Sequence, residues 1–94
     1  MSSKPPIDLY EALASLQTRE QIERFMLDLA TPGERTAFEE RWDIAWLLEA
    51  GELSYRDIAA QTGASTTTVS RVNRFLKQEK NGGYRLIFDR FLKK

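Results

Sequence analysis

The sequence predicts an all-α protein of about six short helices. Apolar residues recur at spacings of three and four along several stretches, and residue types that cap helix starts come before those stretches. Glycine and proline separate the stretches, and no stretch is a convincing strand. At 94 residues with 41% apolar content, the chain suits a single domain over residues 1–94, and dimerisation would help so short a chain to form a core.

Two helix starts are expected near the N-terminus. Residues 1–6 predict a flexible tail, because their serines and prolines offer no apolar face. Asp8 predicts the first start, with Glu11 three residues on as the reciprocal capping partner. Thr18 and Gln21 repeat this signature before a second helix. The apolar stripe of that helix consists of Ile22, Phe25, Met26 and Leu29.

A third helix is predicted to be the longest, at about 18 residues. It begins with Thr31 as the N-cap and Glu34 as its partner, and it ends at Gly51. Trp42 and Trp46 stand one turn apart on it. We interpret these two side chains as buried packing, with stacking against a nucleic-acid base as the alternative.

Residues 54–77 predict a helix-turn-helix. Ser54 caps its first helix, Gly63 can take the positive φ of a sharp corner, and Ser65 caps its second helix. The inner faces of the two helices carry the small or apolar residues Ile58, Ala59, Val69 and Val72. The free face of the second helix is almost wholly polar and consists of Thr66, Thr67, Ser70, Arg71 and Arg74. A polar helix face on a rigid corner fits a DNA major groove, whereas the alternative is a surface hairpin in an ordinary bundle.

A last helix follows the break at Gly82 and Gly83. Its apolar residues are Tyr84, Leu86, Ile87, Phe88, Phe91 and Leu92. That surface is too apolar for a freely solvated end, so we expect this helix to dock, with a second subunit as one partner.

The composition excludes several function classes. The chain has no cysteine and no histidine, which removes disulfides, the usual zinc ligands and the commonest general base, so we predict no metal. An enzyme would need a carboxylate pair or an activated lysine, and no spacing suggests one, so we predict that the chain is not an enzyme. No apolar run is long enough to span a bilayer or to form a signal peptide, so we expect a soluble cytoplasmic protein.

The charges are unevenly distributed although the formal net charge is zero. Residues 1–53 contain 5 Lys/Arg against 11 Asp/Glu, whereas residues 54–80 contain 5 against 2 and residues 81–94 contain 4 against 1. An acidic half and a basic half indicate that one side faces phosphate, and a solvated self-complementary surface is the alternative.

With these elements placed, the chain resembles the tryptophan repressor superfamily, in particular its branch of repressor-related bacterial proteins. The resemblance runs without a gap over residues 31–77, about half the chain, and it includes the helix before the helix-turn-helix. The residues that carry it are Thr31-Pro32, Glu34-Arg35, Arg41, Leu47-Leu48, Gly51-Glu52, Ser54, Arg56-Asp57-Ile58, Gly63-Ala64, Thr68-Val69-Ser70-Arg71, Asn73 and Leu76-Lys77.

The resemblance implies an intertwined all-α homodimer with a helix-turn-helix in each subunit. It also implies that Arg56 and the start of the second motif helix contact DNA. Together with the basic residues of the motif, the predicted DNA-binding set is Arg56, Ser65, Thr66, Thr67, Thr68, Ser70, Arg71, Arg74 and Lys77.

The resemblance further implies a ligand pocket in which two arginines clasp a corepressor. The matching residues here are Arg41 and Arg71, with Thr31 nearby. Val72 and Phe75 stand where the family pocket needs a glycine and a small serine, and their side chains would fill the space of an indole. We therefore predict no tryptophan cofactor, and the two arginines could bind another anion, pair with Asp or Glu, or contact phosphate.

The predicted function is a sequence-specific DNA-binding transcriptional regulator, of the repressor type, acting as a homodimer on double-stranded DNA with a roughly palindromic operator. One alternative is a protein-interaction subunit derived from a helix-turn-helix, with weak or no specific DNA binding. Another is a ligand-responsive repressor whose corepressor is not tryptophan.

Overall fold

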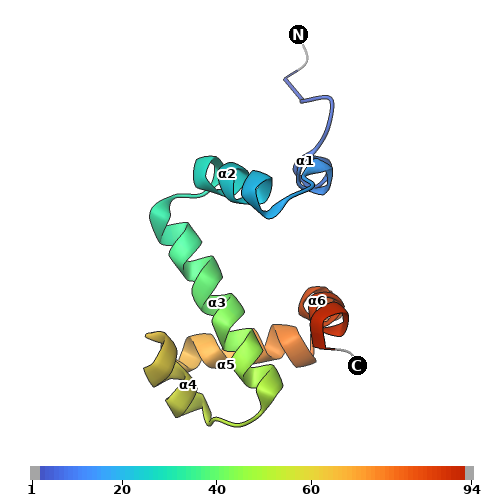
Figure 1. Cartoon of the computed structure of the whole chain (residues 1–94). Coiled ribbons are helices and arrows are strands. Elements are labelled where there is room, and N and C mark those ends of the chain that lie inside the picture. Colours follow the sequence, from blue (N-terminus) through green and yellow to red (C-terminus); the bar gives the residue numbers. More distant parts are fainter. Residues whose placement is uncertain (1–2, 93–94) are drawn as a thin grey trace. The chain divides into compact units, whose positions relative to one another are not determined.

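The computed structural model describes residues 3–92, where all regular structure is helical (Figure 1). Six helices lie within these residues: α1 (Leu9–Ser15), α2 (Arg19–Leu29), α3 (Pro32–Ala50), α4 (Tyr55–Thr62), α5 (Thr66–Lys77) and α6 (Gly83–Leu92). The prediction of an all-α fold with about six helices is therefore confirmed. The contacts divide the chain into two compact units, Met1–Arg35 and Thr36–Lys94, with α3 beginning in the first unit. A single domain over residues 1–94 stays a prediction.

Side-chain caps begin the first two helices. The backbone N–H of Glu11 donates to Asp8 at 2.8 Å, and the N–H of Asp8 donates to Glu11 at 3.0 Å, which completes the predicted capping box. At α2 the Thr18 hydroxyl accepts from the N–H of Gln21 at 3.1 Å. The Gln21 side chain accepts from the N–H of Gln17 at 2.8 Å, so the second box is not reciprocal with Thr18. Residues 1 and 2 of the predicted tail lie outside the described residues.

A second complete capping box begins α3. The N–H of Glu34 donates to the Thr31 hydroxyl at 3.2 Å, and the N–H of Thr31 donates to the Glu34 carboxylate at 2.8 Å. These hydrogen bonds from the Thr31 backbone and side chain favour the charged carboxylate and hold the pKa of Glu34 below its usual value. At its other end, α3 stops one residue before Gly51, which has a φ of 72° as its predicted terminating role requires.

The first unit has amphipathic helices but almost no buried core. Neither α1 nor α2 contains a buried residue, and Ala30 is the one buried residue among residues 3–35. The Arg35 guanidinium donates to the Ala30 carbonyl at 2.7 Å and to the Leu27 carbonyl at 3.4 Å, which satisfies two acceptors at the end of α2. The large apolar side chains that remain exposed in this unit are Ile7, Leu9, Tyr10, Ile22, Leu27 and Leu29.

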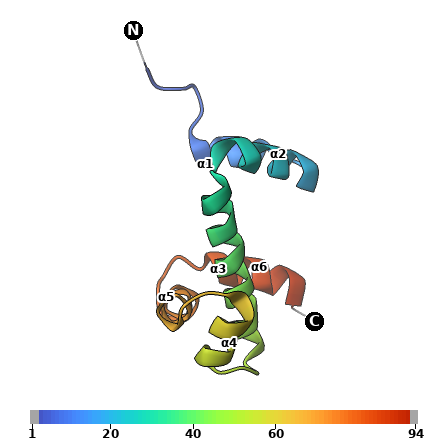
Figure 2. The same ribbon diagram turned by 90° about the vertical axis from the view of Figure 1, so that its left-hand side faces the viewer.

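The second unit contains the hydrophobic core. Here α4, α5 and α6 gather around the C-terminal half of α3 (Figures 1 and 2). Each of these four helices contributes to one buried cluster of Ile44, Ala45, Leu48, Ile58, Val69, Val72, Leu76 and Phe88. Burial of these side chains is the main force that holds the three short helices in place.

The last helix docks on its own chain through one face. Phe88 of α6 is 1% exposed and lies 5.3 Å from the Trp42 ring and 6.0 Å from the Trp46 ring, measured between ring centroids. The prediction that the two tryptophans are buried was wrong for the single chain, since they are 38% and 44% exposed. Each packs one side against Phe88 and leaves the rest accessible. Phe91, one turn further along α6, lines an apolar groove with Trp42, Trp46 and Phe88 and is 78% exposed.

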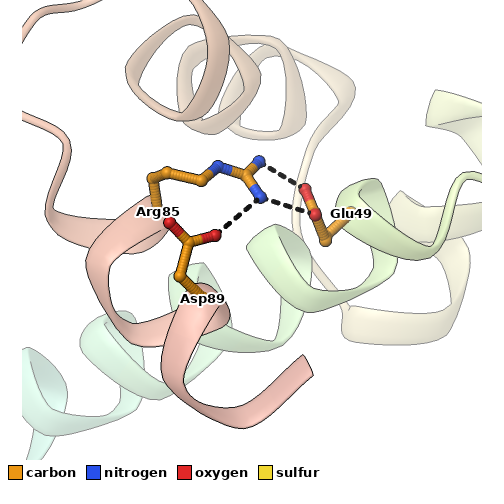
Figure 3. Close-up of polar contacts among 3 residues, drawn as sticks. All are labelled: Glu49, Arg85 and Asp89. Carbon is orange, nitrogen blue, oxygen red and sulfur yellow. Dashed lines mark hydrogen bonds and ion pairs between the residues drawn. The ribbon is translucent and has the colours of Figure 1, made fainter. Parts of the chain in front are cut away.

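An ion pair also joins α6 to α3 (Figure 3). Arg85 donates to both carboxylate oxygens of Glu49 at 2.7 Å, and its guanidinium lies 4.0 Å from Asp89. The hydrogen bonds from Arg85 are the main cause that lowers the pKa of Glu49. This bidentate geometry sets the rotation of α6 against α3 more sharply than apolar packing alone.

Candidate nucleic-acid interface

The sharp corner between α4 and α5 is built by caps and one glycine. The Ser54 hydroxyl accepts from the N–H of Asp57 at 3.1 Å, and the Ser65 hydroxyl accepts from the N–H of Thr68 at 3.1 Å. Gly63 ends α4 with a φ of 80°, in the left-handed region that favours glycine. Both predicted caps and the predicted role of Gly63 are confirmed, and the two helices fall within the predicted residues 54–77.

The exposed side of α5 borders an open groove of about 870 Å³. The residues that line it are Tyr55, Thr66, Thr67, Ser70, Arg71, Asn73, Arg74 and Gln78. The structure thus brings together all five residues of the polar face predicted from helical spacing. Asn73 and Gln78 were missed, although spacings of three from Ser70 and four from Arg74 could have indicated them. Tyr55 comes from α4 and had no such signal.

The other predicted DNA-binding residues do not line this groove. The hydroxyls of Ser65 and Thr68 lie 3.0 Å apart at the start of α5, where Ser65 also caps the helix. Arg56 is exposed in the first turn of α4, and Lys77 is exposed in the last turn of α5. Arg56 and Lys77 thus lie near the two ends of the motif. The ends are where a helix seated in a DNA groove meets the phosphate backbone.

The cations of the motif differ in their partners. Arg74 Nε lies 3.7 Å from the Glu79 carboxylate, and the Arg74 guanidinium lies 5.2 Å from the centroid of the Phe75 ring. Over residues 3–92, no carboxylate lies within ion-pair distance of Arg56 or Arg71. The guanidinium groups of Arg56 and Arg71 are exposed and have no carboxylate partner among these residues.

A second, more apolar groove of about 430 Å³ lies on the other side of Arg71. Its lining residues are Arg41, Trp42, Arg71, Val72, Phe75, Asn81, Gly83, Tyr84 and Ile87. Two of the three predicted pocket residues, Arg41 and Arg71, thus border one groove, and Arg71 borders both grooves. The Arg41 Nε donates to the Ala37 carbonyl at 3.3 Å. Thr31 belongs to the first unit, where it caps α3.

Val72 and Phe75 occupy different depths beside this groove. Val72 is 2% exposed and is part of the core, whereas Phe75 is half-buried. Their predicted effect on an indole ligand stays a prediction. In the part of the chain that the structure describes, no group of His, Cys, Asp or Glu side chains could hold a metal ion. None of its helices combines the length and apolarity needed to cross a membrane.

Comparisons with known proteins agree with these features. Residues 7–92 match the family model described as Trp repressor protein. The chain is 38% identical over 82 residues to Bacillus subtilis (strain 168) "Uncharacterized protein YerC", covering 87% of this chain and 77% of that protein.

Two solved structures have the same fold. A TrpR like protein from Eubacterium eligens ATCC 27750 is 38% identical, with a TM-score of 0.82 over 90% of this chain and 86% of that chain. The protein in a crystal structure from Staphylococcus aureus is 34% identical in sequence to this chain. Its TM-score is 0.80, and the match covers 92% of this chain and 84% of that chain. By its sequence and its six-helix fold, the chain belongs to the Trp repressor protein family, a family of regulators and not of enzymes.

Proposed function

We propose that this protein is a sequence-specific DNA-binding regulator of transcription, of the repressor type, which acts as a homodimer. One observation carries the proposal: the three hydroxyls and two guanidinium groups on one face of α5 border a single open groove. Membership of the Trp repressor family supports the same conclusion.

The chemistry of the groove suits the edges of DNA bases. Thr66, Thr67 and Ser70 each offer a hydroxyl that can donate and accept a hydrogen bond, directly or through water. α5 is held by its buried side against α4, so its polar side can enter a major groove as a rigid body. We assign base contacts to these three residues.

The basic residues at the rim suit phosphate. Arg56, Arg71, Arg74 and Lys77 are exposed around or beside the groove. Each phosphate that they neutralise releases counterions, so the logarithm of the affinity should fall with the logarithm of the salt concentration by about 0.9 per contact. A steep salt dependence is therefore expected.

The proposed homodimer is interlocked through the first unit. Its two helices bury no residue of their own although they carry large apolar side chains. Phe91 and Leu86 on α6 are likewise exposed in the single chain. Exposed apolar surface of this extent is typical of an interface, and a second copy of the chain would cover it.

In vitro selection on randomised duplexes tests the proposed function. Two heads related by a two-fold axis should enrich inverted half-sites about 34 Å apart, one turn of DNA. If the protein is a dimer and yet enriches no sequence, the proposal fails and a protein-interaction subunit becomes the better explanation.

A ligand-responsive repressor is the second candidate, because Arg41 and Arg71 border the same apolar groove. Two guanidinium groups beside apolar walls fit an organic anion with an apolar part. Thermal unfolding with a panel of small carboxylic acids tests this candidate. A stabilising acid whose effect is lost in Arg41→Gln supports it, whereas no stabilisation by any acid counts against it.

A further inference from the structure

Glu79 is an acidic residue in a basic stretch. Residues 58–88 contain five Lys/Arg and one acidic residue, Glu79 itself. The Glu79 carboxylate lies 3.7 Å from Arg74 Nε, and the Glu79 N–H donates to the Arg74 carbonyl at 3.0 Å. The backbone thus places this carboxylate beside an arginine that borders the α5 groove.

The position of Glu79 does not favour the helix that it follows. α5 ends at Lys77, and the C-terminal end of a helix carries a partial negative charge that repels a carboxylate. The Arg74 guanidinium is the positive group that the structure pairs with this carboxylate. The Arg74 guanidinium also lies 5.2 Å from the centroid of the Phe75 ring, and Arg74 lines the groove.

The ion pair is open to exchange. The Arg74 and Glu79 side chains are 56% and 43% exposed, and ion pairs this exposed contribute little stability. A DNA phosphate that approaches the rim can therefore take the place of Glu79. Because the Arg74–Glu79 contact is lost in the exchange, its loss offsets part of the energy gained from the phosphate contact. The exchange also leaves the negatively charged Glu79 near the DNA backbone.

We propose that Glu79 is an internal counter-ion that competes with DNA phosphate for Arg74. This inference rests on the proposed function and deepens it. By weakening a contact that is the same for every sequence, Glu79 lowers non-specific affinity. The hydroxyls of Thr66, Thr67 and Ser70 then contribute a larger share of the total binding free energy.

The test measures binding of the full chain to a mixed-sequence duplex of about 21 base pairs, two turns of DNA, by fluorescence anisotropy at several salt concentrations. The variants are Glu79→Gln, Arg74→Gln and the double variant. Glu52→Gln is the matched control, because it removes one exposed negative charge from the same unit at a residue with no ion pair in the described chain. Circular dichroism checks that each variant is folded.

We expect Glu79→Gln to bind about threefold more tightly than the parent at low salt, with a gain that shrinks as salt screens the charges. Glu52→Gln should gain less, and Glu79→Gln should gain nothing beyond that in the Arg74→Gln background. Equal gains for the two glutamate variants, or a gain that persists without Arg74, would overturn the inference alone. If the parent chain binds no duplex at any salt concentration, the proposed function falls and the inference falls with it.

Discussion

The two units of this chain differ in how far they bury the apolar faces of their helices. In residues 36–92, short helices bury Ile58, Val69 and Phe88 almost completely. In residues 3–35, α1 and α2 are equally well capped, yet they bury none of their own residues. The helix-turn-helix therefore has its core within one chain, whereas the first unit presents apolar faces that its own residues do not cover.

This difference separates local helix formation from tertiary stability. Caps decide where a helix begins and contribute about 1 kcal/mol each, so both units can have regular helices. A stable position for those helices requires buried apolar area, because most helical stability in proteins comes from packing. We therefore expect changes in the second unit to act on folding and changes in the first unit to act on assembly.

The largest expected effect is the loss of the side chain that closes the core. Phe88→Ala should lower the free energy of unfolding by about 3–5 kcal/mol, because it leaves a cavity beside Trp42 and Trp46. Urea denaturation followed by circular dichroism measures the change. Phe91→Ala, three residues on in α6 and 78% exposed, is the matched control. If both variants lose the same free energy of unfolding at a protein concentration where the chain is monomeric, Phe88 does not have the special role in the core that we assign to it.

A charge on the apolar face of the first unit should act on assembly. Ile22→Lys in α2 places an ammonium group where the proposed interface needs an apolar surface, so the dimer dissociation constant should rise at least about tenfold. Sedimentation at several protein concentrations measures the constant. Asp28→Lys on the same helix is the control. If Ile22→Lys leaves the mass unchanged, this face does not form the interface.

Two glycines allow a smaller test of the same contrast. Gly63→Ala should destabilise the second unit by about 1 kcal/mol, because its φ of 80° is unfavourable for alanine even though no atom lies within 4 Å of the added Cβ. Gly33→Ala lies inside α3 with the same open space and no positive φ, so it should be neutral or slightly stabilising. Thermal unfolding of both variants measures this, and equal effects would show that the corner is not under backbone constraint.

The smallest expected effect is the pH dependence of the capping box at α3. The pKa of Glu34 is lowered in the folded chain, so its charged form adds stability above the usual glutamate value of 4.5, and this stability is lost as the pH falls through the lowered value. Glu34→Gln should be less stable than the parent at neutral pH and should match it in acid. Unfolding at a series of pH values measures the difference, with Glu39→Gln on the same helix as the control. A difference that does not change with pH would remove this role of Glu34.

The local features of the fold were predictable because their causes are local. Capping boxes at Asp8 and Thr31 and the left-handed glycine at Gly63 depend on residues within four positions of one another. The pair between Arg85 and Glu49 joins residues 36 positions apart, and no local pattern indicates it. The exposure of Trp42 was missed for the same reason, since a one-face stripe does not say how much of each side chain its partner covers.

In the candidate site, too, the features with local causes were the predictable ones. The five predicted residues of the polar face belong to one helix, so their common position follows from helical spacing. Tyr55 also lines the groove but belongs to α4. Its position beside the other residues depends on how α4 crosses α5, and helical spacing does not predict that crossing. The contact of Arg74 with Glu79 required the path of the chain after α5, where helical spacing no longer applies.

The central claim is that the polar face of α5 reads DNA, and one substitution tests it most directly. Thr67→Glu places a carboxylate in the middle of the groove, whereas Gln61→Glu places the same charge on an exposed position of α4 that does not line the groove. Binding of both variants to the selected operator should be compared with that of the parent chain. We predict that Thr67→Glu loses specific binding while the protein stays folded and dimeric, and that Gln61→Glu binds nearly as well as the parent. Equal binding by the two variants would contradict the claim.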